Sequence, residues 1–204
     1  FSMDYFANER YLLPLSHDEV VHGKATILQK MHGDYEGKFP QARALYLYML
    51  AHPGKKLNFM GNELGHFREW DEGREQDWNL LDYPLHQGFL AFHRALNHCY
   101  LTAPALWRDG GTGFFTWLQR GEDGLFAFLR EGNGQRLLAV FNFLDREQDL
   151  SLFLNGATRL QLMLDSDSAA FGGSAQEKPE VPAAKYSGLR LTLPPYSGRL
   201  YQVE

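Results

Sequence analysis

The sequence lacks several features that would assign it to a special class of protein. A single cysteine, Cys99, occurs among 204 residues, so no disulfide framework can form within the chain. We therefore expect a reducing, cytoplasmic compartment, with Cys99 packed in the core. The longest uncharged apolar stretches, such as residues 44–51, fall far short of the roughly 20 residues of a membrane helix.

A strong charge of one sign is missing as well. The formal net charge is -5 and is divided almost evenly between the two halves of the chain, which argues against nucleic acid as a partner. The first five residues have neither the basic start nor the apolar core of a signal peptide, and Phe1 is not an initiator methionine. We therefore expect that the chain begins inside a longer protein.

Two patterns divide the sequence near residues 107–111. The first part is mainly helical: a helix opening at Pro40 and ending at residues 52–54, a buried strand within residues 55–60, and a long polar and aromatic loop over residues 62–84. A second helix follows over residues 85–101, with Phe89, Phe92, His93, Leu96, Cys99 and Tyr100 on one face. A strand that leads into such a loop between helices is typical of a (β/α)8 barrel, whose loops of this kind carry the chemistry.

The second part consists almost entirely of predicted strands. They cover residues 114–118, 125–130, 137–144, 160–164, 189–193 and 199–203, and turn residues separate them. Residues 131–134 (EGNG) are the clearest hairpin signal. Residues 166–184 read as a long surface loop with room for one short strand. Strands at this spacing predict an antiparallel β-sandwich.

The most informative segment is an apolar, strand-like run that ends abruptly in Ser16, His17, Asp18 and Glu19. A zinc helix is one alternative, but His17 and His22 are five residues apart and would diverge by about 140° on a helix, so we predict no metal site. The other alternative is that Ser16 and Asp18 cap a helix beginning at Glu19. From spacing alone, a functional strand tip and a simple helix cap both stay open.

Three segments in order resemble signature regions of the branching enzymes in the alpha-amylase family. They are residues 13–20 (LPLSHDEV), residues 53–65 (PGKKLNFMGNELG), and residues 68–70 (REW) leading to Asp77 and Trp78. The resemblance covers essentially the whole chain. It implies an α/β plus all-β fold, with residues 1–107 as the C-terminal part of the catalytic (β/α)8 barrel and residues 108–204 as a C-terminal β-sandwich domain.

The resemblance also implies an activity, 1,4-alpha-glucan branching in glycogen biosynthesis. An alpha-1,4-glucan segment of glycogen or amylose is transferred to a 6-hydroxyl to form an alpha-1,6 branch, without a cofactor. Retaining chemistry of this kind needs a carboxylate nucleophile and a general acid/base, which the resemblance places upstream of this chain. Asp18 matches the family's transition-state stabiliser and His17 its sugar-binding histidine. Glu19, Asn62, Glu63 and Trp70 are expected to support them, and the chain alone is expected to be inactive.

Other interpretations of the sequence lead to different expectations. An alpha-amylase-type hydrolase or a trehalose-forming relative shares the His-Asp pair, and a non-catalytic glucan-binding module needs no complete site. His66 stands where the resemblance leads us to expect glutamine. Trp107 and Trp117 are expected in the core between the two parts, and Lys24, Lys30 and Lys38 on the solvated surface. Exposed barrel edges predict self-association of the chain.

Overall fold

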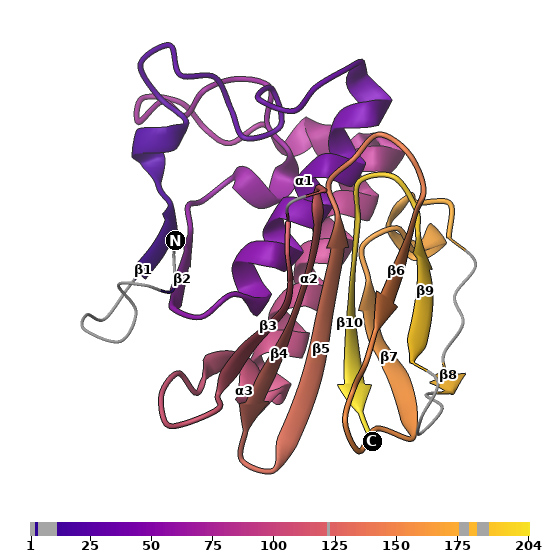
Figure 1. The fold of residues 1–204 in the computed structure, drawn as a ribbon. Coiled ribbons are helices and arrows are strands. Elements are labelled where there is room, and N and C mark those ends of the chain that lie inside the picture. Colours follow the sequence, from indigo (N-terminus) through magenta and orange to yellow (C-terminus); the bar gives the residue numbers. More distant parts are fainter. Residues whose placement is uncertain (1–2, 4–11, 122, 176–179, 183–187) are drawn as a thin grey trace.

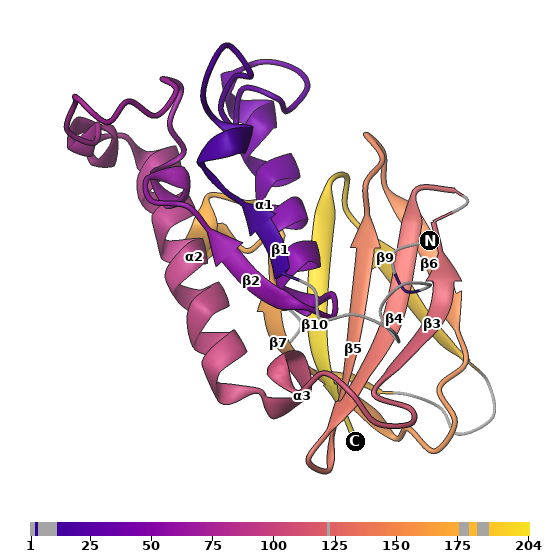
Figure 2. The same cartoon turned by 90° about the vertical axis from the view of Figure 1, so that its left-hand side faces the viewer.

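The computed structural model describes residues 3, 12–121, 123–175, 180–182 and 188–204. The described elements stack in layers, which Figures 1 and 2 show from two directions. A parallel pair of strands lies on one side, two long helices lie next to it, and a six-stranded sheet and then a two-stranded sheet follow. Among the described residues, no helix is both long and apolar enough to cross a membrane.

The parallel pair and the helices form the first half of the chain. Strand β1 (Leu12–Leu15) pairs with β2 (Lys55–Asn58), and helix α1 (Tyr35–Ala51) connects the two. Such a crossover is what parallel strands require, because their ends lie far apart. Helices α2 (Pro84–Thr102) and α3 (Pro104–Trp107) follow β2. The loops after β1 and after β2 leave the pair from the same end, since the strands are parallel.

Helix α1 begins earlier than the sequence pattern predicts. Its first residue is Tyr35, and Asp34 caps it by accepting a hydrogen bond from the Gly37 amide at 2.9 Å. Pro40 lies inside the helix, so the prediction that it occupies the first position is wrong. The side-chain cap at Asp34 satisfies one of the free amides of the first turn, which makes this start favourable. The predicted end is confirmed, because His52 is the carboxyl-terminal cap.

The next two predicted elements had different outcomes. Strand β2 is present, but it is not buried: Lys55 and Asn58 are exposed, because β1 is its one strand neighbour in the described chain. Helix α2 carries the predicted apolar face, and five of its six predicted residues are buried while Tyr100 is partly so. Cys99 is buried there as expected, and burial raises the pKa of its thiol to about 11.

The second half of the chain builds the two antiparallel sheets. The larger has the order β3-β4-β5-β10-β7-β8, with β3 (Phe115–Arg120), β4 (Leu125–Gly132), β5 (Gln135–Asn142), β10 (Ser197–Val203), β7 (Arg159–Asp165) and β8 (Glu180–Pro182). The smaller pairs β6 (Gln148–Leu152) with β9 (Leu189–Leu193). Residues 148–152 were not among the predicted strands, because only Leu150 and Leu152 mark their buried face.

The predicted hairpin between β4 and β5 is confirmed. Gly132 pairs with Gln135 across the turn, and the two residues between them, Asn133 and Gly134, have φ angles of 52° and 76°. Positive φ at both central positions is the turn that matches the right-handed twist of paired strands, and Asn-Gly suits it because both residues tolerate this conformation.

The large sheet is covered on both faces. One core joins it to α1 and α2 and includes Leu47, Phe89, Phe141 and Leu200, while a second core fills the space between it and the β6-β9 pair. Trp117 packs against the first core as predicted. Trp107 does not: it is 38% exposed, because Ala105 and Leu106 occupy the inward side of the single turn α3.

Candidate functional site

The polar segment after β1 folds into a tight, capped 3₁₀ turn over His17–Glu19. Ser16 is its N-cap, and the Glu19 carboxylate accepts hydrogen bonds from the Ser16 hydroxyl at 2.7 Å and from the Ser16 amide at 2.5 Å. The hydroxyl is the main reason that the pKa of Glu19 is lowered. A capping interpretation therefore holds for Ser16 and Glu19, but the turn begins at His17 and Asp18 is not its cap.

His17 and Asp18 project from this turn as an exposed pair. Nε2 of His17 lies 3.5 Å from Oδ1 of Asp18, and the two side chains are 53% and 69% exposed. The His17 ring contacts the rings of Phe59, at 5.8 Å between centroids, and Trp70, at 6.3 Å. Phe59 and Trp70 also meet edge to face at 5.2 Å. An imidazole supported from two sides beside an exposed carboxylate is suited to binding a polyhydroxylated ligand from outside.

Asn62 and Glu63 lie in a second 3₁₀ turn, Asn62–Leu64, after β2. The Asn62 side chain donates to the Leu15 carbonyl at 3.2 Å and to Oδ1 of Asn58 at 3.1 Å, so it joins the ends of β1 and β2. Glu63 influences a different residue, Tyr46. Burial of Tyr46 is the main cause that raises its pKa, and the charge of Glu63 is the second. Of these two residues, the structure ties Asn62 directly to the strand that carries His17 and Asp18.

The loop over residues 66–77 makes close contacts with the segment after the 3₁₀ turn. Glu69 accepts hydrogen bonds from the amides of Gly23, at 2.9 Å, and Ala25, at 2.7 Å. These two bonds are the main causes that lower the pKa of Glu69. The Trp70 amide donates to the Val20 carbonyl at 3.1 Å. The sequence resemblance identified residues 68–70, but their contact with residues 23–25, more than 40 positions earlier, was not predicted.

An ion pair closes the base of the same loop. Arg68 donates to both carboxylate oxygens of Asp77, with a shortest distance of 2.8 Å. The Arg68 guanidinium is the first cause that holds the pKa of Asp77 below its usual range. Trp78, next to this pair, is 54% exposed. The ion pair therefore fixes the two ends of the loop that carries Glu69 and Trp70.

Of the three lysines that were expected on the solvated surface, Lys24 and Lys30 are exposed as predicted and Lys38 is partly buried. All three also bind backbone carbonyls. Lys24 donates to the Asp18 carbonyl at 2.7 Å. Lys30 donates to the carbonyls of Glu19 and Ala25. Lys38 donates to the carbonyl of Met31. A long lysine stem can lie along the protein surface while its ammonium satisfies carbonyls of an irregular loop.

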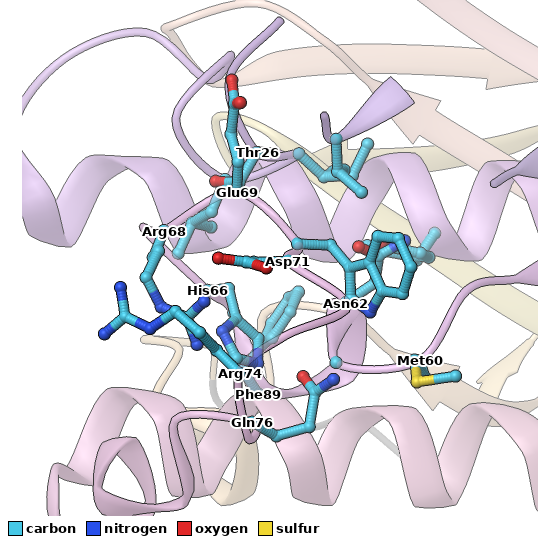
Figure 3. A pocket seen from close by; sticks show the side chains of 17 residues that line it. Thr26, Met60, Asn62, His66, Arg68, Glu69, Asp71, Arg74, Gln76 and Phe89 are labelled. Carbon is cyan, nitrogen blue, oxygen red and sulfur yellow. The ribbon is translucent and has the colours of Figure 1, made fainter. Parts of the chain in front are cut away.

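A small cavity lies between the loop of residues 60–76 and the helices (Figure 3). His66 lines it; its Nδ1 lies 3.3 Å from Oδ2 of Asp77, and its Nε2 is buried without a hydrogen-bond partner. Burial lowers the pKa of His66. The cavity volume is about 20 Å³, which is room for about one water molecule and not for a sugar ring.

The candidate site consists of protein side chains and backbone groups. In the described residues no group of three or more His, Cys, Asp or Glu side chains is arranged to hold a metal ion. The structure brings together His17, Asp18 and Trp70, with Glu19 and Asn62 supporting their turn. Sequence reasoning did not identify Phe59, Glu69 or Lys24 as neighbours of this turn, although Phe59 and Glu69 lie within segments that carried the resemblance.

Known proteins match most or all of the chain, and a family model matches its second half. Residues 117–204 match the family model described as "Alpha amylase, C-terminal all-beta domain". A 1,4-alpha-glucan branching enzyme of Oceanobacillus iheyensis is 40% identical over 218 residues, covering 100% of this chain and 34% of the relative. The corresponding enzyme of Salinibacter ruber is 40% identical over 96% of this chain and 33% of its own length. The chain therefore spans about a third of the length of these curated relatives.

Solved structures show the same fold. A debranching enzyme from Nostoc punctiforme superimposes with a TM-score of 0.61 at 23% sequence identity, over 94% of this chain and 33% of that one. At this identity the likeness concerns the fold alone. It covers the helical half of the described chain as well as the antiparallel sheets.

Proposed function

We propose that this chain, a homologue of the carboxyl-terminal third of the 1,4-alpha-glucan branching enzymes, supplies one side of the active site of such an enzyme. The observation that carries the proposal is the exposed pair of His17 and Asp18 at the tip of β1. The whole of the chain that carries this pair aligns with a curated branching enzyme at 40% identity. The reaction joins a segment of an alpha-1,4-glucan to a 6-hydroxyl and belongs to glycogen biosynthesis.

In this proposal residues 1–107 are the last portion of a (β/α)8 barrel and residues 108–204 are the C-terminal β-sandwich. The parallel pair β1 and β2, linked through α1 and followed by α2, supports the barrel assignment. In such barrels the functional groups lie on the loops after the carboxyl ends of the strands. His17 and Asp18 follow β1, and Asn62 and Trp70 follow β2, which agrees with that rule.

Asp18 acts by stabilising charge. Cleavage of a glycosidic bond with retention passes through a sugar that carries positive charge, and needs a nucleophile and a general acid/base, which we assign to the preceding part of the longer protein. A carboxylate fixed near this charge stabilises the transition state more than the neutral ground state. His17 lies 3.5 Å from Asp18 and can donate a hydrogen bond to a hydroxyl of the same sugar.

The remaining residues hold this pair in place. Glu19 and Ser16 fix the turn, Asn62 joins the ends of the two strands, and Trp70 supports the His17 ring. The substrate is glycogen or amylose. The chain alone performs no turnover, and we place the protein in the cytoplasm, in agreement with its single buried cysteine.

The proposal is tested with a fusion protein that has the full length of the relatives. Residues 1–204 are fused to the preceding two thirds of the Oceanobacillus iheyensis relative, and new alpha-1,6 linkages in amylose are counted by proton NMR. We expect branching by the fusion and none by residues 1–204 alone. Asp18→Asn should lower kcat by about a hundredfold or more. The matched control is Asp82→Asn, at an exposed carboxylate, which should keep the activity of the unmodified fusion.

Two results would overturn the proposal. One is a fusion that folds and releases reducing ends without forming alpha-1,6 linkages, because that is hydrolysis. The other is branching by residues 1–204 alone, because the nucleophile and the acid/base would then lie within this chain.

A further inference from the structure

The backbone directly after the candidate site adopts an unfavourable conformation. His22, Gly23 and Ala25 have φ angles of 59°, 78° and 65°. For a residue with a Cβ atom the left-handed region costs on the order of 1–2 kcal/mol, so His22 and Ala25 occupy it against their own preference. Conformations of this kind persist where the surroundings enforce them, and they gather at functional sites.

Glu69 is the side chain that enforces this backbone. Its Oε2 accepts the Gly23 amide at 2.9 Å and its Oε1 accepts the Ala25 amide at 2.7 Å. Both oxygens of one carboxylate are therefore used, one on each side of Lys24. Hydrogen bonds to a charged acceptor are about twice as strong as neutral ones. Within the described part of the chain, the hydrogen bonds that the Glu69 carboxylate accepts go to this loop.

The residue held between these two bonds reaches back to the site. Lys24 donates from its ammonium group to the carbonyl of Asp18 at 2.7 Å. Trp70, the residue after Glu69, donates its amide to the Val20 carbonyl at 3.1 Å. A continuous set of contacts therefore runs from Glu69 through the backbone of residues 23–25 and Lys24 to Asp18.

We propose that Glu69 is a positioning residue for the reaction, which acts on Asp18 through Lys24. This inference rests on the proposed function. Catalytic groups must be held closely, since a displacement of about 1 Å can cost a hundredfold in rate. The carboxylate of Asp18 is 69% exposed, so its position is set by its backbone rather than by packing of its own side chain. Glu69 holds residues 23–25, and through Lys24 the Asp18 carbonyl, from a partly buried position outside either hydrophobic core.

The first experiment compares Glu69→Gln with Glu72→Gln in the fusion described above. Glutamine has one acceptor oxygen, so its amino group would face one of the two backbone amides. We expect kcat to fall by about tenfold to a hundredfold with KM for amylose unchanged. Glu72 is exposed on the same loop, and its variant should match the unmodified fusion. An unchanged kcat in Glu69→Gln would overturn the inference.

A second measurement separates positioning from a general effect on the fold. Lys24→Met should lower kcat to a similar degree, and the double variant with Glu69→Gln should be no worse than either single one, because both act through the same contact. In an Asp18→Asn background, Glu69→Gln should have no further effect. If the losses instead multiply independently, Glu69 does not act through Lys24 and Asp18.

A third measurement does not depend on activity. In residues 1–204 alone, NMR signals of the Asp18 carboxyl carbon and the His17 ring should move in Glu69→Gln and stay in place in Glu72→Gln, and exchange of the Gly23 and Ala25 amides should become faster. Unmoved signals would overturn the inference even if the fusion forms no branches. An inactive fusion in which the signals do move would count against the proposed function alone.

Discussion

The guanidinium group of Arg130 lies fully buried and donates a hydrogen bond of 2.7 Å to the carbonyl oxygen of Ala51, at the last turn of α1. The same group donates to the Leu106 carbonyl at 3.3 Å and pairs with Asp109 at 2.6 Å. Earlier in α1, Arg43 is also fully buried and donates to the Ser166 carbonyl at 2.5 Å. Two buried arginines thus tie the helix that follows β1 to the antiparallel sheet.

Arg130→Met should destabilise the chain strongly. The substitution keeps an unbranched side chain but removes the guanidinium from two carbonyls and from Asp109, which retains the Gly54 amide and Lys55. Breaking a buried ion pair costs about 3–5 kcal/mol. Urea unfolding followed by circular dichroism measures this loss. Arg120→Met is the matched control, because Arg120 is exposed and its replacement should change the free energy of unfolding by less than about 0.5 kcal/mol. Equal stability of the two variants would contradict this role of Arg130.

Much of the fold follows from local patterns in the sequence. The face of α2 is marked by apolar residues at three- and four-residue spacing, and Asn133-Gly134 specifies the turn between β4 and β5. Local patterns failed where a neighbouring group decided the outcome. The cap at Asp34 places the start of α1 before Pro40, and the direction of α3 leaves Trp107 exposed.

The sequence named candidate residues for the site but did not reveal their contacts. The strand-like run that ends in His17 and Asp18 left a helix cap open as an alternative, and the resemblance over residues 13–20 favoured a functional site there. The link from Glu69 to Ala25 joins residues 44 positions apart, and it depends on the parallel pairing of β1 and β2, which places their following loops together. No periodicity encodes such a contact, so it required the three-dimensional arrangement.

The stability of the chain should fall in mild acid because of His93. Burial lowers the pKa of this imidazole to about 4, whereas in the unfolded chain it is about 6.5. The unfolded state therefore binds a proton first as the pH falls. The contribution of His93 is fully present above about pH 6.5 and is lost progressively toward about pH 4, on the order of 3 kcal/mol in all.

Urea unfolding across this pH range measures the effect. Burial also lowers the pKa values of His52, His66 and His86, so the unmodified chain should show a steeper fall than His93 alone produces. His93→Phe should remove part of the pH dependence and fit among the rings of Tyr46 and Phe89, which lie 4.5 Å away. His98→Gln, at an exposed position, is the control. A pH dependence that is identical in His93→Phe would argue against a buried neutral imidazole.

Residues 1–204 alone should self-associate through β1. Leu12 is 50% exposed on this strand, whose other edge is unpaired within the described chain, and an apolar hollow lies beside it, lined by Leu13, Pro14, Leu15, Leu45, Tyr48, Met49 and His52. Unpaired strand edges and exposed apolar surface favour association, and a lysine on the edge opposes it. Sedimentation velocity over a concentration series should show oligomers that Leu12→Lys reduces. Leu101→Lys, at a leucine that is 75% exposed on α2, should not reduce them, and a monomer at every concentration would contradict this prediction.

Trp70 should report the arrival of a glucan at His17. Its ring lies 6.3 Å from the His17 ring, so a sugar bound to the His17 and Asp18 pair would change its surroundings, and aromatic faces suit the apolar faces of sugars. We expect maltooligosaccharides to change the tryptophan fluorescence of residues 1–204. Trp70→Phe and Asp18→Asn should each abolish the change, whereas Trp78→Phe, at a tryptophan that is 54% exposed, should retain it. A response that persists in Trp70→Phe and disappears in Trp78→Phe would place the sugar against the outer part of the loop, away from Asp18.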